Sequence, residues 1–135
     1  MRLILSEDGL TKKSKCIDLH YLIQHTKSNP KLMMEMISLY LEQTPLLVNC
    51  MKRSLKEKDW TSLYSAVHKM IPSFVIMGIS HDFEDMAKKV QEYAGMQKQT
   101  DGIPDLVLQL ETVCLQACTE LKVEYNMIKN TKNAN

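Results

Sequence analysis

His68 is the residue of this sequence whose type and setting best support chemistry. An imidazole titrates near neutral pH, and its unprotonated nitrogen can act as a nucleophile. At about 100° per residue, the apolar residues around it fall on one stripe of a predicted helix, and His68 points about 100° or more away from the centre of that stripe. The stripe consists of Leu63, Val67, Met70, Phe74 and Met77. We therefore expect His68 to face solvent.

The outer face around His68 carries apolar side chains, which is typical of a docking surface. The residues on this face are Tyr64, Ser65, Ile71, Pro72 and Val75. Pro72 has no N–H and its ring crowds the carbonyl of His68, so we expect the helix to bend or loosen at this turn. Gly78 has no side chain and should allow a neighbouring helix or loop to approach closely.

The sequence offers His68 little catalytic help of its own. No carboxylate lies within one turn of it in either direction. Lys69 is adjacent, and Lys88 or Lys89 could supply positive charge for an anion from across a helical hairpin. A hydrolase triad, a paired-carboxylate site and a glycine-rich phosphate loop are all absent. A reactive His68 would therefore be a substrate-like nucleophile, and most of the machinery would come from another protein.

The remaining candidate residues have structural interpretations. His20, His25 and His81 lack a comparable setting, and we expect each to be structural or merely exposed. Cys114 and Cys118 share a helix face, but no second Cys/His pair has matching ligand spacing, so we predict buried small hydrophobes and no metal site. The ten methionines are interpreted as adaptable core filling.

Composition bounds the class of protein. The chain of 135 residues is long enough for one domain with a real core. Its 17 basic and 16 acidic residues form no basic stripe, which argues against nucleic-acid binding. No apolar stretch approaches the length of a membrane span, and Glu7 and Asp8 end the first apolar run too early for a signal peptide. We expect a cytoplasmic protein without membrane insertion.

Prolines and capping residues predict the first helices. Asp18 should cap a short helix that ends near residue 26. Pro30 follows two cap-forming residues and should open a long helix that reaches about residue 58. Pro45 lies inside this span, so we expect a kink or a restart there.

The later helices have similar boundary signals. Asp59 should cap the helix of His68, which runs from Trp60 to about Gly78. Ser80 restarts the chain and Gly95 ends the next helix. Pro104 opens the last helix, whose apolar residues recur at helical spacing.

These elements predict an all-α protein. Long amphipathic helices with short connections indicate an antiparallel four-helix bundle, with one or two short extra helices at the N-terminus. We assign residues 1–15 to a weakly structured lead, residues 16–129 to the bundle, and residues 130–135 to a polar, frayed tail.

The run from His68 to Gly78 resembles the signature of histidine-containing phosphotransfer (HPt) domains of bacterial two-component phosphorelays. That signature reads roughly Ala-His-x-Leu-Lys-Gly-Ser, with a further glycine some five residues later. His68 falls on the phosphoacceptor and Met70 on the apolar position. The other matches are Pro72 on the usual glycine, Ser73 on the small polar residue and Gly78 on the later glycine. The resemblance covers about residues 16–125 and implies a four-helix bundle. One departure matters, because Ile71 stands where the family usually has a lysine that helps to hold the phosphoryl group.

The resemblance implies a carrier in a phosphorelay rather than a free-standing enzyme. His68 would take a phosphoryl group from a phosphoaspartate of a response-regulator receiver domain and pass it to an aspartate of another receiver. The receiver, or a hybrid sensor kinase that contains one, would be the partner and would supply magnesium, so no cofactor is expected on this chain. Lys69, Pro72, Ser73, Gly78, Lys88 and Lys89 would support the site. Tyr64, Ser65, Ile71 and Val75 would form the docking patch, and we expect a monomer rather than a dimer.

Two other functions stay open at this point. Because Ile71 replaces the usual lysine, the chain could be a non-catalytic adaptor that binds a receiver without being phosphorylated. A methionine-rich bundle could also bind an amphipathic partner helix, with His68 as a bystander. Receiver binding separates the last alternative from the other two, and acid-labile phosphate on His68 separates the relay from the adaptor.

Overall fold

The structure is a computed structural model, and it describes residues 15–97 and 101–134. These residues form five α-helices and no strand. The helices are α1 (His20–Thr26), α2 (Pro30–Glu57), α3 (Trp60–Ile76), α4 (His81–Gly95) and α5 (Ile103–Ala134). The prediction of an all-α fold is confirmed. Within the described ranges, no helix has both the length and the apolar character needed to span a membrane.

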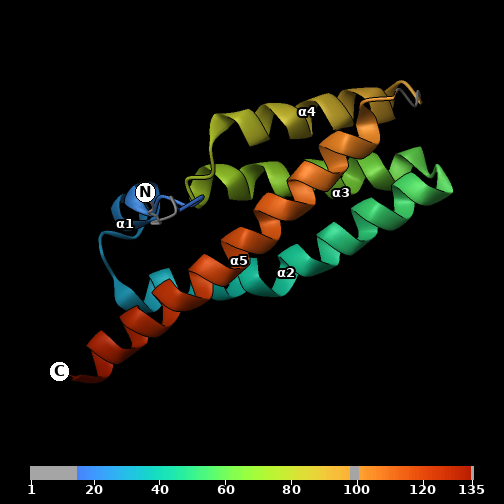
Figure 1. The fold of residues 1–135 in the computed structure, drawn as a ribbon. Helices are drawn as coiled ribbons and strands as arrows, with labels where there is room; N and C mark the ends of the chain where they lie inside the picture. The colour runs from blue at the N-terminus through green and yellow to red at the C-terminus, as the bar shows by residue number, and fades with distance from the viewer. Residues whose placement is uncertain (1–14, 98–100, 135) are drawn as a thin grey trace, which may run out of the picture.

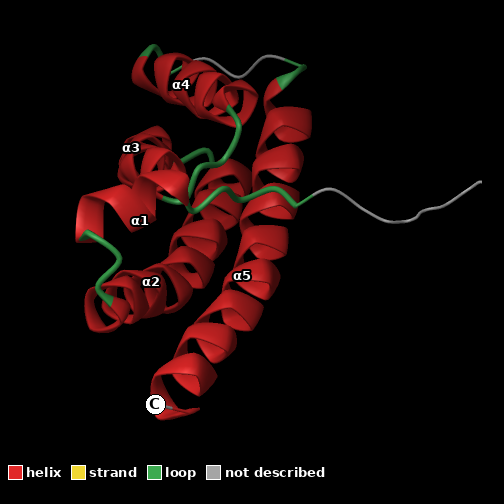
Figure 2. Cartoon of the chain, turned by 90° about the vertical axis from the view of Figure 1, so that its left-hand side faces the viewer, coloured by secondary structure: helices red, strands yellow, loops and turns green. Residues whose placement is uncertain are grey.

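The four long helices form an antiparallel bundle in which neighbours in the chain are also neighbours in space. Helix α3 packs between α2 and α4, and α5 closes the ring by packing on α4 and α2. Figure 1 shows successive long helices running in opposite directions. The short α1 contacts α2 and α3 at one end of the bundle, as the turned view in Figure 2 shows. This arrangement places α3 between two helices that can each contribute side chains beside His68.

The core lies along the axis of the bundle and receives side chains from all five helices. Its largest fully buried members are Leu22, Ile37, Met51, Leu63, Val67, Met70, Phe74, Val90, Ile103, Leu110, Cys114 and Leu121. Burial of an aliphatic or aromatic side chain of this size stabilises the fold by about 1.5–3 kcal/mol. The bundle is therefore held chiefly by its apolar interior.

Capping residues act at most of the predicted helix starts. The Asn29 side chain accepts a hydrogen bond from the Leu32 amide at 3.1 Å, and Ser80 Oγ accepts one from the Asp82 amide at 3.3 Å. The prediction for α1 is wrong in detail, because the helix begins at His20 with Leu19 in the capping position. Asp18 Oδ1 still accepts a hydrogen bond from the His20 amide at 3.0 Å, so its carboxylate satisfies the first free N–H.

Helix α2 continues through Pro45 without a restart. Proline at this position removes one backbone hydrogen bond. Tyr40, Thr44 and Val48 are nevertheless all buried, on the same side of α2. We infer that burial of this face outweighs the lost hydrogen bond, since tertiary packing usually decides whether a helix persists.

The ends of the chain differ in how far the structure describes them. Helix α5 runs on to Ala134, so the backbone of residues 130–134 is helical in the structure. The predicted weakly structured lead, residues 1–15, lies outside the described residues except for Lys15. Part of the polar loop between α4 and α5, residues 98–100, also lies outside them.

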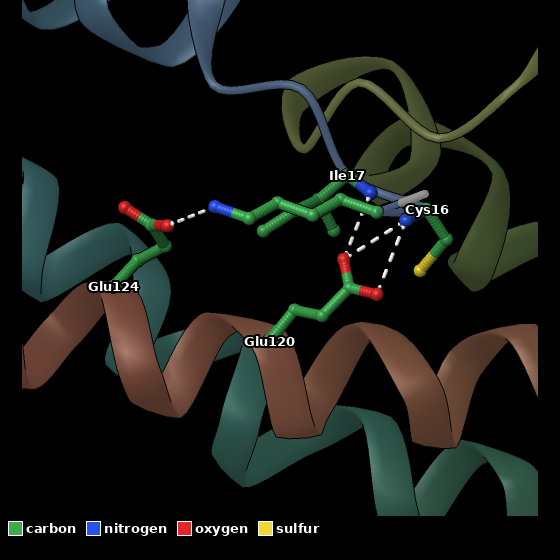
Figure 3. A network of polar contacts seen from close by, with 5 residues as sticks. Cys16, Ile17, Glu120 and Glu124 are labelled. Carbon is green, nitrogen blue, oxygen red and sulfur yellow. Dashed lines mark hydrogen bonds and ion pairs between the residues drawn. The ribbon is translucent and has the colours of Figure 1, made fainter. Parts of the chain in front are cut away.

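Residues 15–19 form a strap that ties α5 to the end of α3. Figure 3 shows the Glu120 carboxylate accepting hydrogen bonds from the backbone N–H groups of Cys16 and Ile17, at 2.9 and 3.2 Å. Lys15 Nζ lies 2.7 Å from the carboxylate of Glu124 on the same helix. At its other end the strap binds α3, because the Asp18 amide donates to the Met77 carbonyl at 3.0 Å.

Gly78 is the residue that lets the strap cross so closely. Its φ is +68°, in the left-handed region that favours glycine. A Cβ at this position would lie 2.0 Å from the backbone oxygen of Asp18. The prediction that Gly78 permits close approach is confirmed, and the approaching segment is the strap.

Candidate functional site

Helix α3 presents His68 to solvent as the periodicity predicts. The apolar stripe is buried, with each of its five side chains no more than 2 % exposed, whereas His68 is exposed. Asp59 caps the helix, since its carboxylate accepts hydrogen bonds from the Ser62 hydroxyl at 2.8 Å and the Ser62 amide at 3.2 Å. The hydroxyl hydrogen bond, followed by the amide one, lowers the pKa of Asp59. The cap and the stripe together fix the rotation of α3.

Two side chains contact the imidazole of His68. Its Nδ1 lies 3.4 Å from Oε1 of Gln91 on α4. The Gln91 amide in turn donates from Nε2 to the Tyr64 hydroxyl at 3.2 Å. The Tyr64 ring stacks on the imidazole, with centroids 5.9 Å apart and planes 14° apart. His68, Tyr64 and Gln91 thus form one connected cluster on the surface formed by α3 and α4.

This cluster favours one tautomer of the neutral imidazole. Because Gln91 uses its NH₂ group on Tyr64, its carbonyl oxygen is the atom that faces Nδ1 and can only accept a hydrogen bond there. Nδ1 then carries the ring proton, and the lone pair resides on Nε2. At 3.4 Å the hydrogen bond is long, so it orients the ring with modest energy. Nε2 is then the nucleophilic nitrogen of this exposed side chain.

Gln91 was not among the residues selected from the sequence. Gln91 could have been identified from the register of the α3–α4 hairpin, because two antiparallel helices joined by a short connection place Gln91 opposite His68. Gly95 lies opposite Tyr64 in the same register, and a Cβ there would lie 3.5 Å from the Tyr64 ring. This register could not be fixed from periodicity alone, since it depends on how tightly the turn at Gly78 closes.

The three candidate lysines lie in different surroundings. Lys69 is exposed on α3, on the side of His68 that faces α2. Lys88 lies on α4 one turn before Gln91, and its ammonium pairs with Glu84 at 3.1 Å. Lys89 is exposed on α4. The structure therefore places Lys69 in a groove with His68 and shows Lys88 engaged elsewhere.

The predicted docking residues do reach the surface, to different degrees. Tyr64 is 39 % and Val75 46 % exposed, and Ser65 is exposed as well. Ile71 is half-buried and packs against the core. Tyr64 belongs to the His68 cluster through its ring and hydroxyl, so it orients the imidazole besides contributing surface.

Pro72 and Ser73 lie on the next turn of α3. The helix continues through Pro72 to Ile76, so the expected bend does not interrupt it. Proline leaves the His68 carbonyl without its usual i+4 backbone donor. The Ser73 hydroxyl donates to the Met70 carbonyl at 2.6 Å. Ser73 therefore satisfies its own helix in this conformation and makes no hydrogen bond with His68.

A groove of about 620 Å³ lies beside His68, between α2 and α3; we call it the α2–α3 groove. It is lined by Gln43, Leu46, Leu47, His68, Lys69 and Pro72. A smaller cavity of about 200 Å³ adjoins it and shares Gln43, Lys69 and Pro72. Leu46 is 67 % exposed, so the α2 wall of the groove presents apolar surface. The imidazole thus has the α3–α4 cluster on one side and a partly apolar, partly polar groove on the other.

The cysteines and the remaining histidines lie in different surroundings from His68. Burial raises the pKa of the Cys16 and Cys114 thiols to about 12 and raises that of Cys118 as well. Among the residues that the structure describes, no group of three or more His, Cys, Asp or Glu side chains is arranged to hold a metal ion. His20, His25 and His81 are all exposed, and His25 stacks on Tyr21.

Together these features define an all-α bundle that presents one oriented histidine on its surface. No protein-family model matches the sequence, and no curated protein matches it. Among solved structures, the chain is similar to histidine-containing phosphotransfer protein B (HptB) from Pseudomonas aeruginosa PAO1, with a TM-score of 0.73 and 15% sequence identity. The match covers 85% of this chain and 98% of the HptB chain. At this level of identity the likeness establishes the fold, which is that of an HPt protein.

Proposed function

We propose that this protein is a phosphorelay carrier in which His68 accepts a phosphoryl group from the phosphoaspartate of one receiver domain and passes it to an aspartate of another. The observation that carries the proposal is the state of His68: it is exposed, its Nδ1 faces Gln91, and its Nε2 makes no hydrogen bond with the described residues. The HPt-like fold and the sequence around His68 support the same function.

The transfer step needs only one nucleophile from this chain. Nε2 of the neutral imidazole attacks phosphorus, the N–P bond forms as the bond to the aspartyl oxygen breaks, and the aspartate leaves as a carboxylate. No proton has to leave Nε2, because the ring proton is on Nδ1. The charge that develops on the ring is stabilised by the Nδ1–H hydrogen bond to the Gln91 carbonyl oxygen.

The partner would supply what this chain lacks. A receiver brings the acidic pocket and magnesium that neutralise the transferred group. It would dock on the exposed apolar residues around His68, including Tyr64 and Val75, where Ile71 adds further apolar character. The chain itself would act as a carrier rather than an enzyme, in the cytoplasm, with receivers or a receiver-bearing hybrid kinase as partners.

The direct test is transfer from a radiolabelled phosphoreceiver to the wild-type protein and to the His68→Gln variant. The proposal predicts label on the wild type alone, and this label should survive base but not acid, as expected for a phosphoramidate bond. Receiver binding without labelling would exclude the relay and support the adaptor. Absence of both would leave only a helical bundle.

The adaptor remains a second candidate because of one observation, the apolar Ile71 at the position of the usual lysine. An Ile71→Lys variant distinguishes the two functions. In a working relay, the flexible stem of the added lysine should bring its ammonium from the α4 side to a phosphoryl oxygen, speed phosphorylation about tenfold through one charge-assisted hydrogen bond and weaken apolar docking. If the variant transfers phosphate more slowly than the wild type, our account of Ile71 is wrong.

A further inference from the structure

We infer that the phosphoryl group on His68 is held from the α2 side of the imidazole, by the Lys69 ammonium and the Gln43 amide in the α2–α3 groove. This inference rests on the proposed function and specifies its anion-binding residues. In this assignment, two residues from different helices, Lys69 and Gln43, take the role of the lysine that the family usually has one turn after the histidine. The sequence alone gave no indication of Gln43.

The first argument is the orientation of the ring. Gln91 on α4 engages Nδ1, and the two ring nitrogens point in widely divergent directions. Nε2 therefore points away from the amide of Gln91. Since α3 lies between α4 and α2, the free side of the ring borders the α2–α3 groove, which His68 itself lines. A phosphoryl group on Nε2 would extend over this groove.

The second argument is the supply of positive charge on each side. On the side of the imidazole that faces α4, the α3 residue Ile71 carries no charge. The register of the α3–α4 hairpin places Lys88 opposite Ile71. The Lys88 ammonium is paired with Glu84, whose side chain is only 13 % exposed. Recruiting Lys88 would break this ion pair and leave the Glu84 carboxylate with its longer contact to His81 Nδ1, at 3.4 Å. On the groove side, Lys69 is exposed and shares the groove with the ring.

The third argument is the chemistry of the groove wall. Gln43 lies on α2 and contributes two N–H donors that can point toward phosphoryl oxygens. Leu46 and Leu47 line the same wall, and an apolar wall lowers the local dielectric and strengthens a lysine–phosphate contact. Lysine binds phosphate as a point charge on a flexible stem, so it does not need the fixed geometry of an i+3 position.

Phosphorylation by phosphoramidate tests this assignment without a receiver. The Nε2–P bond forms as the P–N bond of phosphoramidate breaks and ammonia leaves, so the rate reports the groups of this chain alone. The signal assigned to His68 is the part lost in His68→Gln, and the exposed His20, His25 and His81 serve as internal references. We expect Lys69→Met to slow phosphorylation of His68 about tenfold or more, and Gln43→Leu about threefold to tenfold. Lys69→Arg should retain most of the rate.

Matched controls separate a local effect from a general change in charge. Lys122→Met removes an exposed lysine from α5, and Gln24→Leu removes an exposed amide from α1; both should leave the rate unchanged. The assignment is overturned if His68 is phosphorylated and Lys69→Met and Gln43→Leu stay within twofold of the wild type. It is also overturned if Lys88→Met shows the larger loss, which would move the anion to the α4 side. If His68 takes no phosphate from either phosphoramidate or a phosphoreceiver, the proposed function itself fails.

Discussion

Replacing Gly78 by alanine should destabilise the protein by about 2.5–5.5 kcal/mol, and the structure shows where each part of that loss arises. An alanine held at a φ of +68° costs about 1–2 kcal/mol. Its Cβ would lie 2.0 Å from the Asp18 oxygen, a backbone atom that cannot rotate away, so the strap must move. Moving it breaks the hydrogen bond from Asp18 to Met77, worth about 0.5–1.5 kcal/mol. The movement of the strap also exposes part of the Ile17 side chain, which is 7 % exposed in the folded protein. This exposure destabilises the protein by about another 1–2 kcal/mol.

Denaturant unfolding followed by circular dichroism measures this loss, and two further variants separate its causes. Gly95→Ala is the matched control, because a Cβ there meets only the Tyr64 ring at an ordinary 3.5 Å, and alanine favours the helix by up to about 1 kcal/mol. Asparagine tolerates the left-handed region but carries the same Cβ, so Gly78→Asn should still lose at least about 1.5 kcal/mol. If Gly78→Asn is as stable as the wild type, the overlap with the strap has no energetic consequence and our reasoning fails.

Three further predictions concern the cluster, the strap and the cap. Gln91→Leu should slow phosphorylation of His68 by phosphoramidate about threefold to tenfold, since the ring loses its acceptor; a rate equal to that of Gln24→Leu would exclude an orienting role. Glu120→Ala leaves the strap amides unpaired and should cost about 1–3 kcal/mol in denaturant unfolding. It should also speed the reaction of Cys16 with a thiol reagent, because burial, then the Glu120 charge, raise the pKa of this thiol to about 12; an unchanged labelling rate would contradict this. The hydroxyl and amide hydrogen bonds from Ser62 lower the pKa of Asp59 in the folded state. Ionised Asp59 therefore stabilises the fold fully above the unfolded-state pKa of about 4, and this stabilisation is lost as pH falls through the lower folded-state pKa. The stability difference between wild type and Asp59→Ala should shrink on acidification through this range, and a difference that grows instead would refute the capping argument.

Local rules predicted much of α3 but not its partners. The period of the apolar stripe placed Met70 and Phe74 inside and His68 outside, and the cap at Asp59 followed from residue type alone. Gln91 could not be found in this way, because its position opposite His68 depends on the register between two helices. The choice among Lys69, Lys88 and Lys89 likewise depends on tertiary contacts such as the ion pair between Lys88 and Glu84.

The expectation of a restart at Pro45 was wrong for a physical reason. It was based on local propensity, and the helix continues through Pro45. At Pro45 the buried face around Thr44 and Val48 compensates for the missing hydrogen bond. Propensity is a weak guide wherever packing supplies more energy than one backbone hydrogen bond.

The hydrogen-bonded cluster of His68 closes a much shorter loop of the chain than the strap does, and this difference affects how the protein folds and opens. Gln91 is 23 residues from His68 and 27 from Tyr64, whereas Glu120 holds Cys16 across 104 residues. Closing the longer loop costs about 1 kcal/mol more chain entropy. We therefore expect the α3–α4 hairpin to assemble early and the strap to dock last and detach first. Fraying at the N-terminal side would then expose Cys16 and Ile17 to hydrogen exchange while the imidazole keeps its orientation.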